Sequence, residues 1–258
     1  MKRLILPLLC LFVLASSSFA WMTLPVVGGG GGGSSCPPWY ADAGVTFSWD
    51  GNHDSGNLVG CQDDGTEVTA TNNAMDIGTA YSEAGDPSIG ARANALGDYL
   101  RWAIGTGEVD MAGAGTLCVR INMAALPSAD TVVINAYNST DAVLIYARTS
   151  TNTDLISYYN TTDGPDDYAI GAPAATGWKT IAVSWDKPGD DLSTNPGDNG
   201  TWLSGYEDDL NESLGVHTND PIQIDIGSTS GAPGTNIDFD RVAILNTWKA
   251  DCSALTGW

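Results

Sequence analysis

Basic residues are scarce in this chain of 258 residues. Lysine and arginine together number 10, against 31 aspartate and glutamate residues, which gives a formal net charge of −21. Because a strongly acidic chain repels phosphate backbones, we expect no nucleic acid partner. Histidine is rarer still, represented by His53 and His217 alone, and no cysteine–histidine spacing typical of a zinc site is present.

Long apolar runs are also missing, with one exception at the N-terminus. Leu4–Ala15 is apolar, follows the basic pair Lys2 and Arg3, and precedes a small-residue stretch that ends at Ala20. This order is typical of a secretory signal peptide, so we predict that residues 1–20 are removed and that no stable membrane span remains. An uncleaved anchor is the alternative, but the run is short for a span. The predicted location is secreted or cell surface.

An unbroken glycine run, Gly28–Gly33, follows the signal segment and leads into two serines. Such a tract cannot pack a core, and it lacks the Lys-Ser/Thr ending of a phosphate-binding loop. We therefore predict a flexible linker over residues 21–35 and a folded domain over residues 36–258.

Four cysteines fall in the predicted domain: Cys36, Cys61, Cys118 and Cys252. An even number in a secreted chain predicts two disulfides, with three connectivities open. We favour Cys36–Cys252, because that bond would clip the two ends of the domain together. Some of the thiols staying free is the alternative.

No long segment of the domain has a helical period, and there is no internal repeat. Short runs rich in Val, Ile, Thr, Tyr and Trp alternate with clusters of Gly, Asn, Asp and Pro, which predicts many short strands in a two-sheet sandwich or a barrel. The predicted strands are Val45–Asp50, Thr66–Ala70, Ile89–Leu96, Tyr99–Ile104, Thr116–Met123, Thr131–Tyr137, Val143–Thr149, Leu155–Asn160, Trp178–Asp186, Thr201–Glu207, Ile222–Gly227 and Ile237–Leu245. A polar turn is expected after Asp186.

Three consecutive predicted strands, from Thr131 to Asn160, have one apolar face and one face of aromatic and hydrogen-bonding residues. Strand alternation and a short turn after Tyr137 predict that the first two of them form a hairpin. Aromatic rings stack on the apolar face of a sugar, while Arg and Asn bind its hydroxyl groups. The predicted ligand-binding residues are Asn135, Tyr137, Tyr146, Arg148, Tyr158 and Asn160. An ordinary solvated sheet face is the alternative.

The C-terminal third contains a set of strand motifs in a fixed order. Trp178–Asp186 reads Trp-Lys-Thr-Ile-Ala-Val-Ser-Trp-Asp, Ile222–Ser228 closes on Ile-Gly-Ser, and Ile237–Val242 reads Ile-Asp-Phe-Asp-Arg-Val. These motifs resemble the laminin-G-like branch of the concanavalin A-like lectin/glucanase superfamily. The resemblance implies an all-β fold, a two-sheet antiparallel jelly-roll sandwich, with a concave face that often binds glycan. The Asp-Gly of the family's hairpin is replaced here by Asp208-Asp209.

The resemblance often also implies a structural calcium ion. In jelly-rolls the first and last strands are usually neighbours, so oxygens of Asp50 and Asn52 should approach those of Asp238 and Asp240. Carboxylate and carbonyl oxygens are the ligands that calcium prefers. We therefore predict a structural calcium site at these four residues, with the loop 63–65 as a second candidate and plain surface acidity as the alternative.

The superfamily includes glucanases, which act through a pair of carboxylates. Glu207 and Glu212 match the spacing Glu-x-Asp-x-x-Glu and could serve as nucleophile and acid/base. In the family, however, apolar residues separate the acids, whereas Asp208 and Asn211 stand between them here. The segment is therefore interpreted as a solvated turn. The absence of a Gly-x-Ser-x-Gly elbow argues against a serine hydrolase.

Together these patterns predict a secreted, non-catalytic carbohydrate-binding or adhesion module, whose partner is a polysaccharide or a cell-surface glycan. Two alternatives stay open. One is a glycoside hydrolase or polysaccharide lyase on the same fold, and the other is a structural part of a surface layer or fibre.

Overall fold

The computed structural model divides the chain into two units, residues 1–33 and 34–258. The described residues all belong to the second unit, so the predicted signal peptide and linker lie outside them. They are residues 36, 40, 42–53, 56–84, 88–123, 131–138, 141–147, 154–160, 167–173, 176–186, 191–198, 201–202, 207–208, 220–227, 236–249, 251–253, 255 and 258, with backbone only for 141–173 and 191–208.

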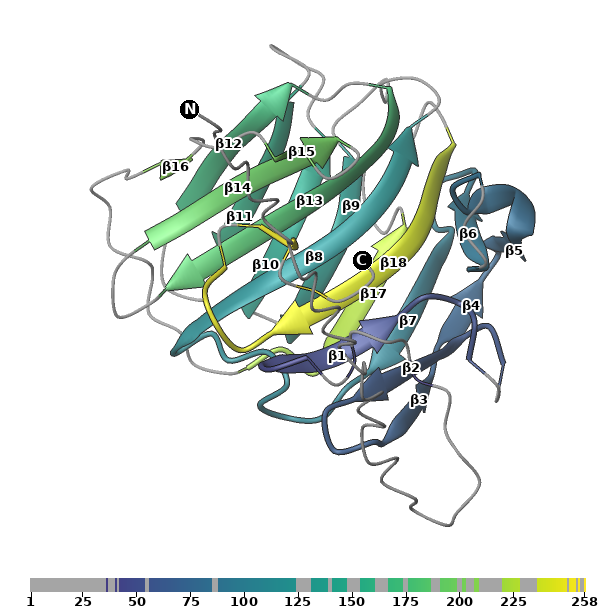
Figure 1. The fold of residues 1–258 in the computed structure, drawn as a ribbon, viewed down its shortest axis with the longest axis horizontal. Helices are drawn as coiled ribbons and strands as arrows, with labels where there is room; N and C mark the ends of the chain where they lie inside the picture. Colours follow the sequence, from purple (N-terminus) through teal and green to yellow (C-terminus); the bar gives the residue numbers. More distant parts are fainter. Residues whose placement is uncertain are drawn as a thin grey trace, which may run out of the picture. The chain divides into compact units, whose positions relative to one another are not determined.

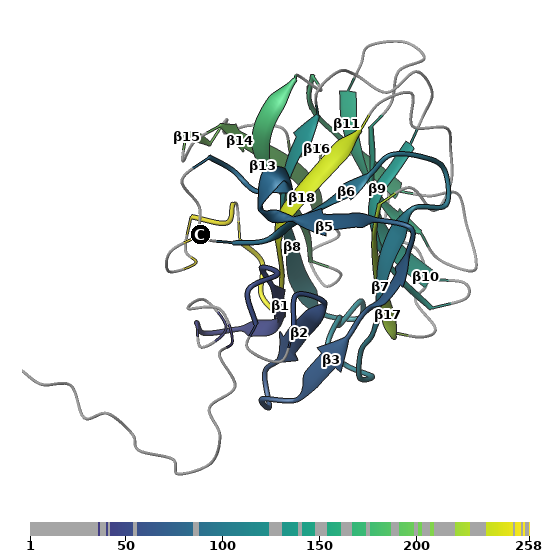
Figure 2. The same ribbon diagram turned by 90° about the vertical axis from the view of Figure 1, so that its right-hand side faces the viewer.

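Two antiparallel sheets form a sandwich, which confirms the predicted fold class (Figures 1 and 2). Sheet A has the order β15 (Thr201–Trp202), β14 (Asp191–Asp198), β13 (Gly177–Asp186), β8 (Ala114–Met123), β18 (Ile237–Leu245), β1 (Val45–Trp49), β2 (Val59–Gln62) and β3 (Glu67–Thr69). Off this path, β16 (Glu207–Asp208) pairs with β14, β6 (Gly90–Ala93) with β18, and β5 (Asp76–Gly78) with β6.

Sheet B has the order β12 (Asp167–Pro173), β11 (Asp154–Asn160), β10 (Asp141–Ala147), β9 (Thr131–Asn138), β17 (Gln223–Gly227), β7 (Tyr99–Ala103) and β4 (Thr71–Asn73). A 3₁₀ turn, Thr79–Tyr81, connects β5 toward β6. Among the described residues, no helix has the length and apolar character needed to cross a membrane.

The predicted hairpin of sheet B is confirmed, since β9 pairs with β10 and β10 with β11. The prediction of a polar turn after Asp186 is wrong for part of the segment. Asp191–Asp198 forms β14, which pairs with β13 from Thr180 to Asp186. Its Asn, Pro and Gly residues favour turns, but the long partner strand supplies a complete hydrogen-bonding ladder, and this tertiary context overrides local preference.

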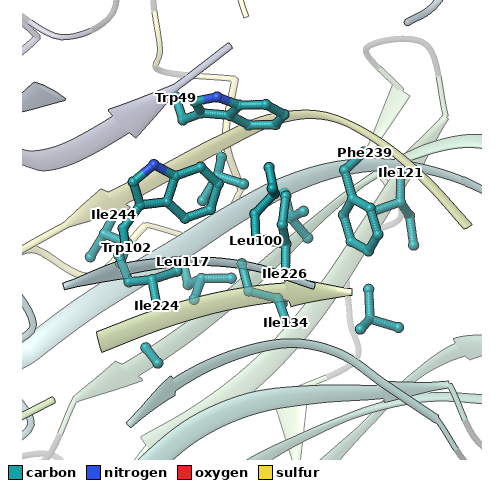
Figure 3. Close-up of a cluster of buried hydrophobic side chains, with 14 of the residues drawn as sticks. Trp49, Leu100, Trp102, Leu117, Ile121, Ile134, Ile224, Ile226, Phe239 and Ile244 are labelled. Atoms are coloured by element: carbon teal, nitrogen blue, oxygen red, sulfur yellow. The ribbon is translucent and has the colours of Figure 1, made fainter. Parts of the chain in front are cut away.

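The main core lies between the sheets and is built around tryptophans (Figure 3). The rings of Trp49 and Trp102 lie 5.3 Å apart, and both side chains are fully buried. Each buried indole N–H has an acceptor: Trp49 Nε1 donates to the carbonyl of Asn57 at 2.8 Å, and Trp102 Nε1 to that of Leu58 at 3.0 Å. A buried indole N–H without an acceptor would destabilise the core. The two bonds also hold the segment that contains Asn57 and Leu58, directly before β2.

A second, smaller core covers the outer face of sheet A. The C-terminal segment after β18 returns across β8, and Figure 1 places the C-terminus in front of these strands. Cys118 and Cys252 form a disulfide there, and Cys36 is bonded to Cys61. All four cysteines are therefore paired, as predicted, but the favoured Cys36–Cys252 bond is wrong. The C-terminal segment is fastened to the middle of a sheet instead of to the other end of the domain.

Replacing Cys118 and Cys252 together by alanine should destabilise the protein more than replacing Cys36 and Cys61. The chain-entropy contribution of a disulfide grows with the sequence separation it closes, which is 134 residues against 25. This separation corresponds to about 5 against about 3.5 kcal/mol. Urea unfolding of the two double variants measures the difference, and an equal or reversed order would contradict it.

Candidate functional site

The outer face of sheet B is the face turned away from sheet A. In β9, β17 and β7 every second residue belongs to the core between the sheets, namely Ile134, Ala136, Ile224, Ile226, Leu100 and Trp102. Because strand residues alternate between faces, the residues between them lie on the outer face. They are Asn135, Tyr137, Gln223, Asp225, Tyr99 and Arg101.

Strand register aligns these residues in rows across the sheet. Asp225 pairs with Asn135 on one side and with Arg101 on the other. In the next row, Gln223 pairs with Tyr137. A carboxylate in the middle strand is therefore flanked by hydrogen-bonding side chains from both neighbouring strands.

Arg101, Tyr137, Gln223 and Asp225 form one hydrogen-bonded network, which we call the Arg101 network. Arg101 donates from Nε to Oδ1 of Asp225 at 2.8 Å and from Nη2 to Oδ2 at 2.7 Å. The same Nη2 donates to the Tyr137 hydroxyl at 2.8 Å, and Gln223 Nε2 donates to that hydroxyl and, at 3.1 Å, to Asp225 Oδ1. Every polar side chain of the network thus has a partner within it.

The electrostatics of the Arg101 network follow from the burial of its carboxylate. The Asp225 side chain is 1% exposed and that of Arg101 is 34% exposed. Hydrogen bonding to Asp225 raises the pKa of Arg101, and burial, reinforced by the same carboxylate, raises the pKa of Tyr137. A buried carboxylate is stable only when it is paired, so the guanidinium group is held in one orientation.

Two aromatic rings flank this fixed guanidinium group. Its central carbon lies 4.7 Å from the ring centre of Tyr99 and 5.8 Å from that of Tyr137. Asn135 lies beside Asp225, and its Oδ1 is buried without a hydrogen-bond partner in the described part of the chain. The face therefore combines flat rings, donors held in place and one buried acceptor.

Five of the six residues predicted for ligand binding lie in described strands of sheet B, and strand pairing places them in neighbouring rows. Asn135 pairs with Leu144, which pairs with Tyr158, and Tyr137 pairs with Ala142, which pairs with Asn160. Tyr146 pairs with Ile156 one step further along β10, so these positions follow adjacent rows of sheet B. Arg148 lies outside the described residues.

Sequence reasoning missed four residues of this face: Tyr99, Arg101, Gln223 and Asp225. The strands that carry them were predicted, and their alternation separates these residues from the core. The order of strands in the sheet was the missing information, because β7 and β17 are far apart in sequence and meet only through non-local pairing.

The predicted calcium residues divide into two groups. Asp238 is bound by Arg92, from Nε to Oδ1 at 2.5 Å and from Nη2 to Oδ2 at 2.9 Å, and it also accepts from Asn122 at 3.0 Å. Asn52 is exposed, and its backbone N–H donates to Asp50 Oδ1 at 2.9 Å. Asp238 is therefore engaged by side chains already, which argues against its role as a ligand.

Asp50 directly follows β1 and Asp240 lies in the neighbouring strand β18, and the charge of Asp50 adds to the raised pKa of Asp240. Burial raises the pKa of both groups, that of Asp240 to about 6, with repulsion from Glu83 and Asp50 adding to the shift. Asp240 accepts from the Ser88 hydroxyl at 2.5 Å, but its Oδ2 has no hydrogen bond, and Arg241 Nε lies 3.5 Å from it. This oxygen set could take a cation.

The candidate catalytic pair remains unsupported. Glu207, the last residue of the predicted strand Thr201–Glu207, lies in β16 and pairs with Ser193 of β14 at the edge of sheet A. Asp208 extends this strand into the segment that was interpreted as a turn. Glu212 lies outside the described residues.

Comparisons with known proteins identify the fold and no family. No family model and no curated protein sequence matches the chain. Among solved structures, the receptor-binding domain of botulinum neurotoxin C/D mosaic serotype is similar with a TM-score of 0.60 and 8% identity, over 80% of this chain and 48% of that chain. The serotype D ligand-binding domain in complex with N-acetylneuraminic acid has a TM-score of 0.60 and 9% identity, over 82% and 50%. The chain spans about half the length of these domains.

In a buffer that contains a chelator, the free energy of unfolding should fall as the pH rises from about 4 to about 6. A carboxyl group whose pKa is raised on folding stabilises the protein below its unfolded pKa and loses this contribution as the pH passes its folded pKa. The increase for Asp240, from 3.8 to about 6, corresponds to about 3 kcal/mol. Urea unfolding at pH 4 and 7 should show a smaller fall for Asp240→Asn, and an equal fall in both proteins would refute this account.

Proposed function

We propose that the chain is a secreted, non-catalytic carbohydrate-binding module of the laminin-G-like type, which binds glycan on the outer face of sheet B. The observation that carries the proposal is the Arg101 network, with the ring of Tyr99 on one side and Asn135 on the other. We take this face to be the concave face that the family resemblance implies.

The chemistry of the face suits a sugar ring. Tyr99 and Tyr137 offer flat apolar surfaces on which the C–H groups of a pyranose stack. The buried Asn135 Oδ1 is an acceptor for a hydroxyl group, and the outer edge of the Arg101 guanidinium supplies donors. Because Asp225 already holds Arg101 in place, little side-chain entropy is lost when a ligand binds.

The charge balance favours a neutral glycan over an acidic one. Arg101 is the only cation on the described residues of β4, β7, β9 and β17, and Asp225 neutralises it. The chain as a whole carries a formal charge of −21, which repels anionic polymers. The preferred partner is therefore a neutral polysaccharide or a neutral cell-surface glycan.

Two further observations support this function. Solved structures with this fold include complexes with N-acetylneuraminic acid and with SialylT, so the sandwich occurs in sugar-binding proteins. Both disulfides suit an oxidising compartment, as expected outside the cell.

We propose in addition that Asp50 and Asp240 hold a structural calcium ion between the first and last strands. The fit rests on the buried Asp240 oxygen that lacks a hydrogen bond and on its closeness to a second carboxylate. A bound divalent cation would neutralise both carboxylates and cross-link β1 to β18.

Tyr99→Ala should weaken the binding of neutral oligosaccharides about tenfold, which corresponds to about 1.4 kcal/mol, because it removes a stacking surface without touching the hydrogen bonds of the Arg101 network. Isothermal titration with laminari-, cello- and xylo-oligosaccharides measures the affinity. Tyr81→Ala is a matched control, since Tyr81 also lies against an arginine, Arg92 at 4.6 Å, but belongs to the connection toward β6.

Sialyllactose and polygalacturonate are the acidic arms of the same titration. Binding of the neutral sugars that is lost in Tyr99→Ala and Asn135→Ala and kept in Tyr81→Ala would support the proposal. Preference for the acidic sugars would contradict the charge argument, and the absence of any binding at millimolar concentration would refute the function itself.

Calcium at millimolar concentration should raise the melting temperature of the wild-type protein, because an ion that binds only the folded state stabilises it. Asp240→Asn should abolish the increase. Asp238→Asn is the control, because Asp238 lies on the same strand as Asp240 but its carboxylate is bound by Arg92. This variant should keep the increase in melting temperature. Calorimetry with and without EDTA tests this, and an increase that survives in Asp240→Asn would rule out the site.

A further inference from the structure

Beyond the glycan face, a buried histidine lies against the Cys36–Cys61 disulfide. The His53 side chain is 1% exposed, and its Nε2 lies 4.0 Å from Cys36 Sγ and 3.6 Å from Glu67 Oε1. The pairing of β2 with β3 sets Cys61 directly opposite Glu67, and the loop after β1 brings His53 to them. We call Cys36, His53, Cys61 and Glu67 the His53 cluster.

The His53 cluster has the donor types and nearly the size of a zinc site. Zinc binds thiolate sulfur at about 2.3 Å and imidazole nitrogen at about 2.0 Å, so ligand atoms of a tetrahedral site lie about 3.5–3.8 Å apart. The ligand atoms of Cys36, His53 and Cys61 all lie within 4.8 Å of one another. Glu67 adds a carboxylate oxygen at the border of this group.

We propose that the His53 cluster binds one Zn²⁺ ion when the Cys36–Cys61 bond is reduced, with both thiolates and His53 as ligands and Glu67 as the fourth ligand or as a partner of the imidazole. Two molecules of a thiol reductant supply the two electrons and two protons, leaving two cysteine thiols and one disulfide of the reductant. Zinc binding then releases both thiol protons.

The Cys36–Cys61 bond is the more accessible of the two disulfides. Cys36 is half-buried, whereas Cys118 and Cys252 are 0% and 1% exposed within the apolar cluster on sheet A. A reductant therefore reaches Cys36 first, because thiol–disulfide exchange requires access to a sulfur atom. The second bond can stay closed while the first one opens.

A zinc ion at this site would preserve the connection between Cys36 and β2 after reduction. Cys36 is the point at which the chain that follows the glycine run is joined to β2. Reduction alone would free this segment from sheet A, whereas zinc would hold the same two sulfur atoms without a covalent bond between them. The domain border would then stay fastened in both oxidising and reducing surroundings.

Titration of the full chain with Co²⁺ tests the proposal, because thiolate-bound tetrahedral Co²⁺ absorbs visible light strongly. Wild-type protein treated with a phosphine reductant should bind one Co²⁺, and Zn²⁺ should displace it. The oxidised protein and the reduced Cys36→Ser/Cys61→Ser variant should show no such spectrum. His53→Gln should lose at least about tenfold in affinity, and Glu67→Gln about tenfold.

A melting experiment covers the case in which the reduced protein folds poorly. Zn²⁺ should then raise the melting temperature of reduced wild-type protein, or restore its folded far-ultraviolet spectrum, and should do neither for reduced His53→Gln. Equal affinity in wild type and His53→Gln, or no saturable binding to the reduced protein, would overturn the proposal. The control for metal capture by free thiols alone is reduced Cys36→Ser/Cys61→Ser, which keeps the thiols of Cys118 and Cys252, and reduced Cys118→Ser/Cys252→Ser should bind one Co²⁺ as the wild type does.

Discussion

The rest of the structure depends on the antiparallel pairing of the first strand with the last. β1 lies between β18 and β2, with Val45 opposite Leu245 and Trp49 opposite Val242. The two ends of the domain therefore meet inside sheet A. All strands of sheet B lie between them in the sequence. Each disulfide braces a strand next to this pair, through Cys61 on β2 and Cys118 on β8.

The return of the chain places β17 between β9 and β7, and this order creates the candidate glycan face. Asp225 is buried in the middle strand, where it would be unstable alone. The neighbouring strands supply Arg101 from one side and Tyr137 from the other. The hydrogen bonds that make this buried charge tolerable also fix the orientation of the groups that face a ligand. The same hydrogen bonds would therefore serve both the stability of the sheet and the glycan binding that we propose.

Local patterns predicted much of this fold, because alternation and turn residues are written in consecutive positions. The hairpin of β9 and β10 was correctly predicted from these patterns, whereas the neighbourhood of β1 and β18 was implied by the family resemblance. Arg101 and Asp225 were not predicted as site residues, because their ion pair depends on the order of strands in the sheet. That order is set by contacts between strands that are distant in sequence. His53 was not predicted as a site residue for the same reason, since its nearest sulfur belongs to Cys36, 17 residues earlier, in a spacing that no short motif describes.

The chain is rich in carboxylates and poor in cations, and three of its arginines form ion pairs with carboxylates. Arg92 pairs with Asp238 of β18 and Arg101 with Asp225 of β17, while Arg120 of β8 pairs with Glu83 in the connection before β6. Asp240 is buried as deeply, but its second oxygen lacks a hydrogen bond, and burial lowers the pKa of the neighbouring Arg241. Arg241 Nε lies 3.5 Å from that oxygen, so this ion pair is longer than the other three. The calcium ion that we propose for this position would add positive charge at the strand pair on which the sandwich depends.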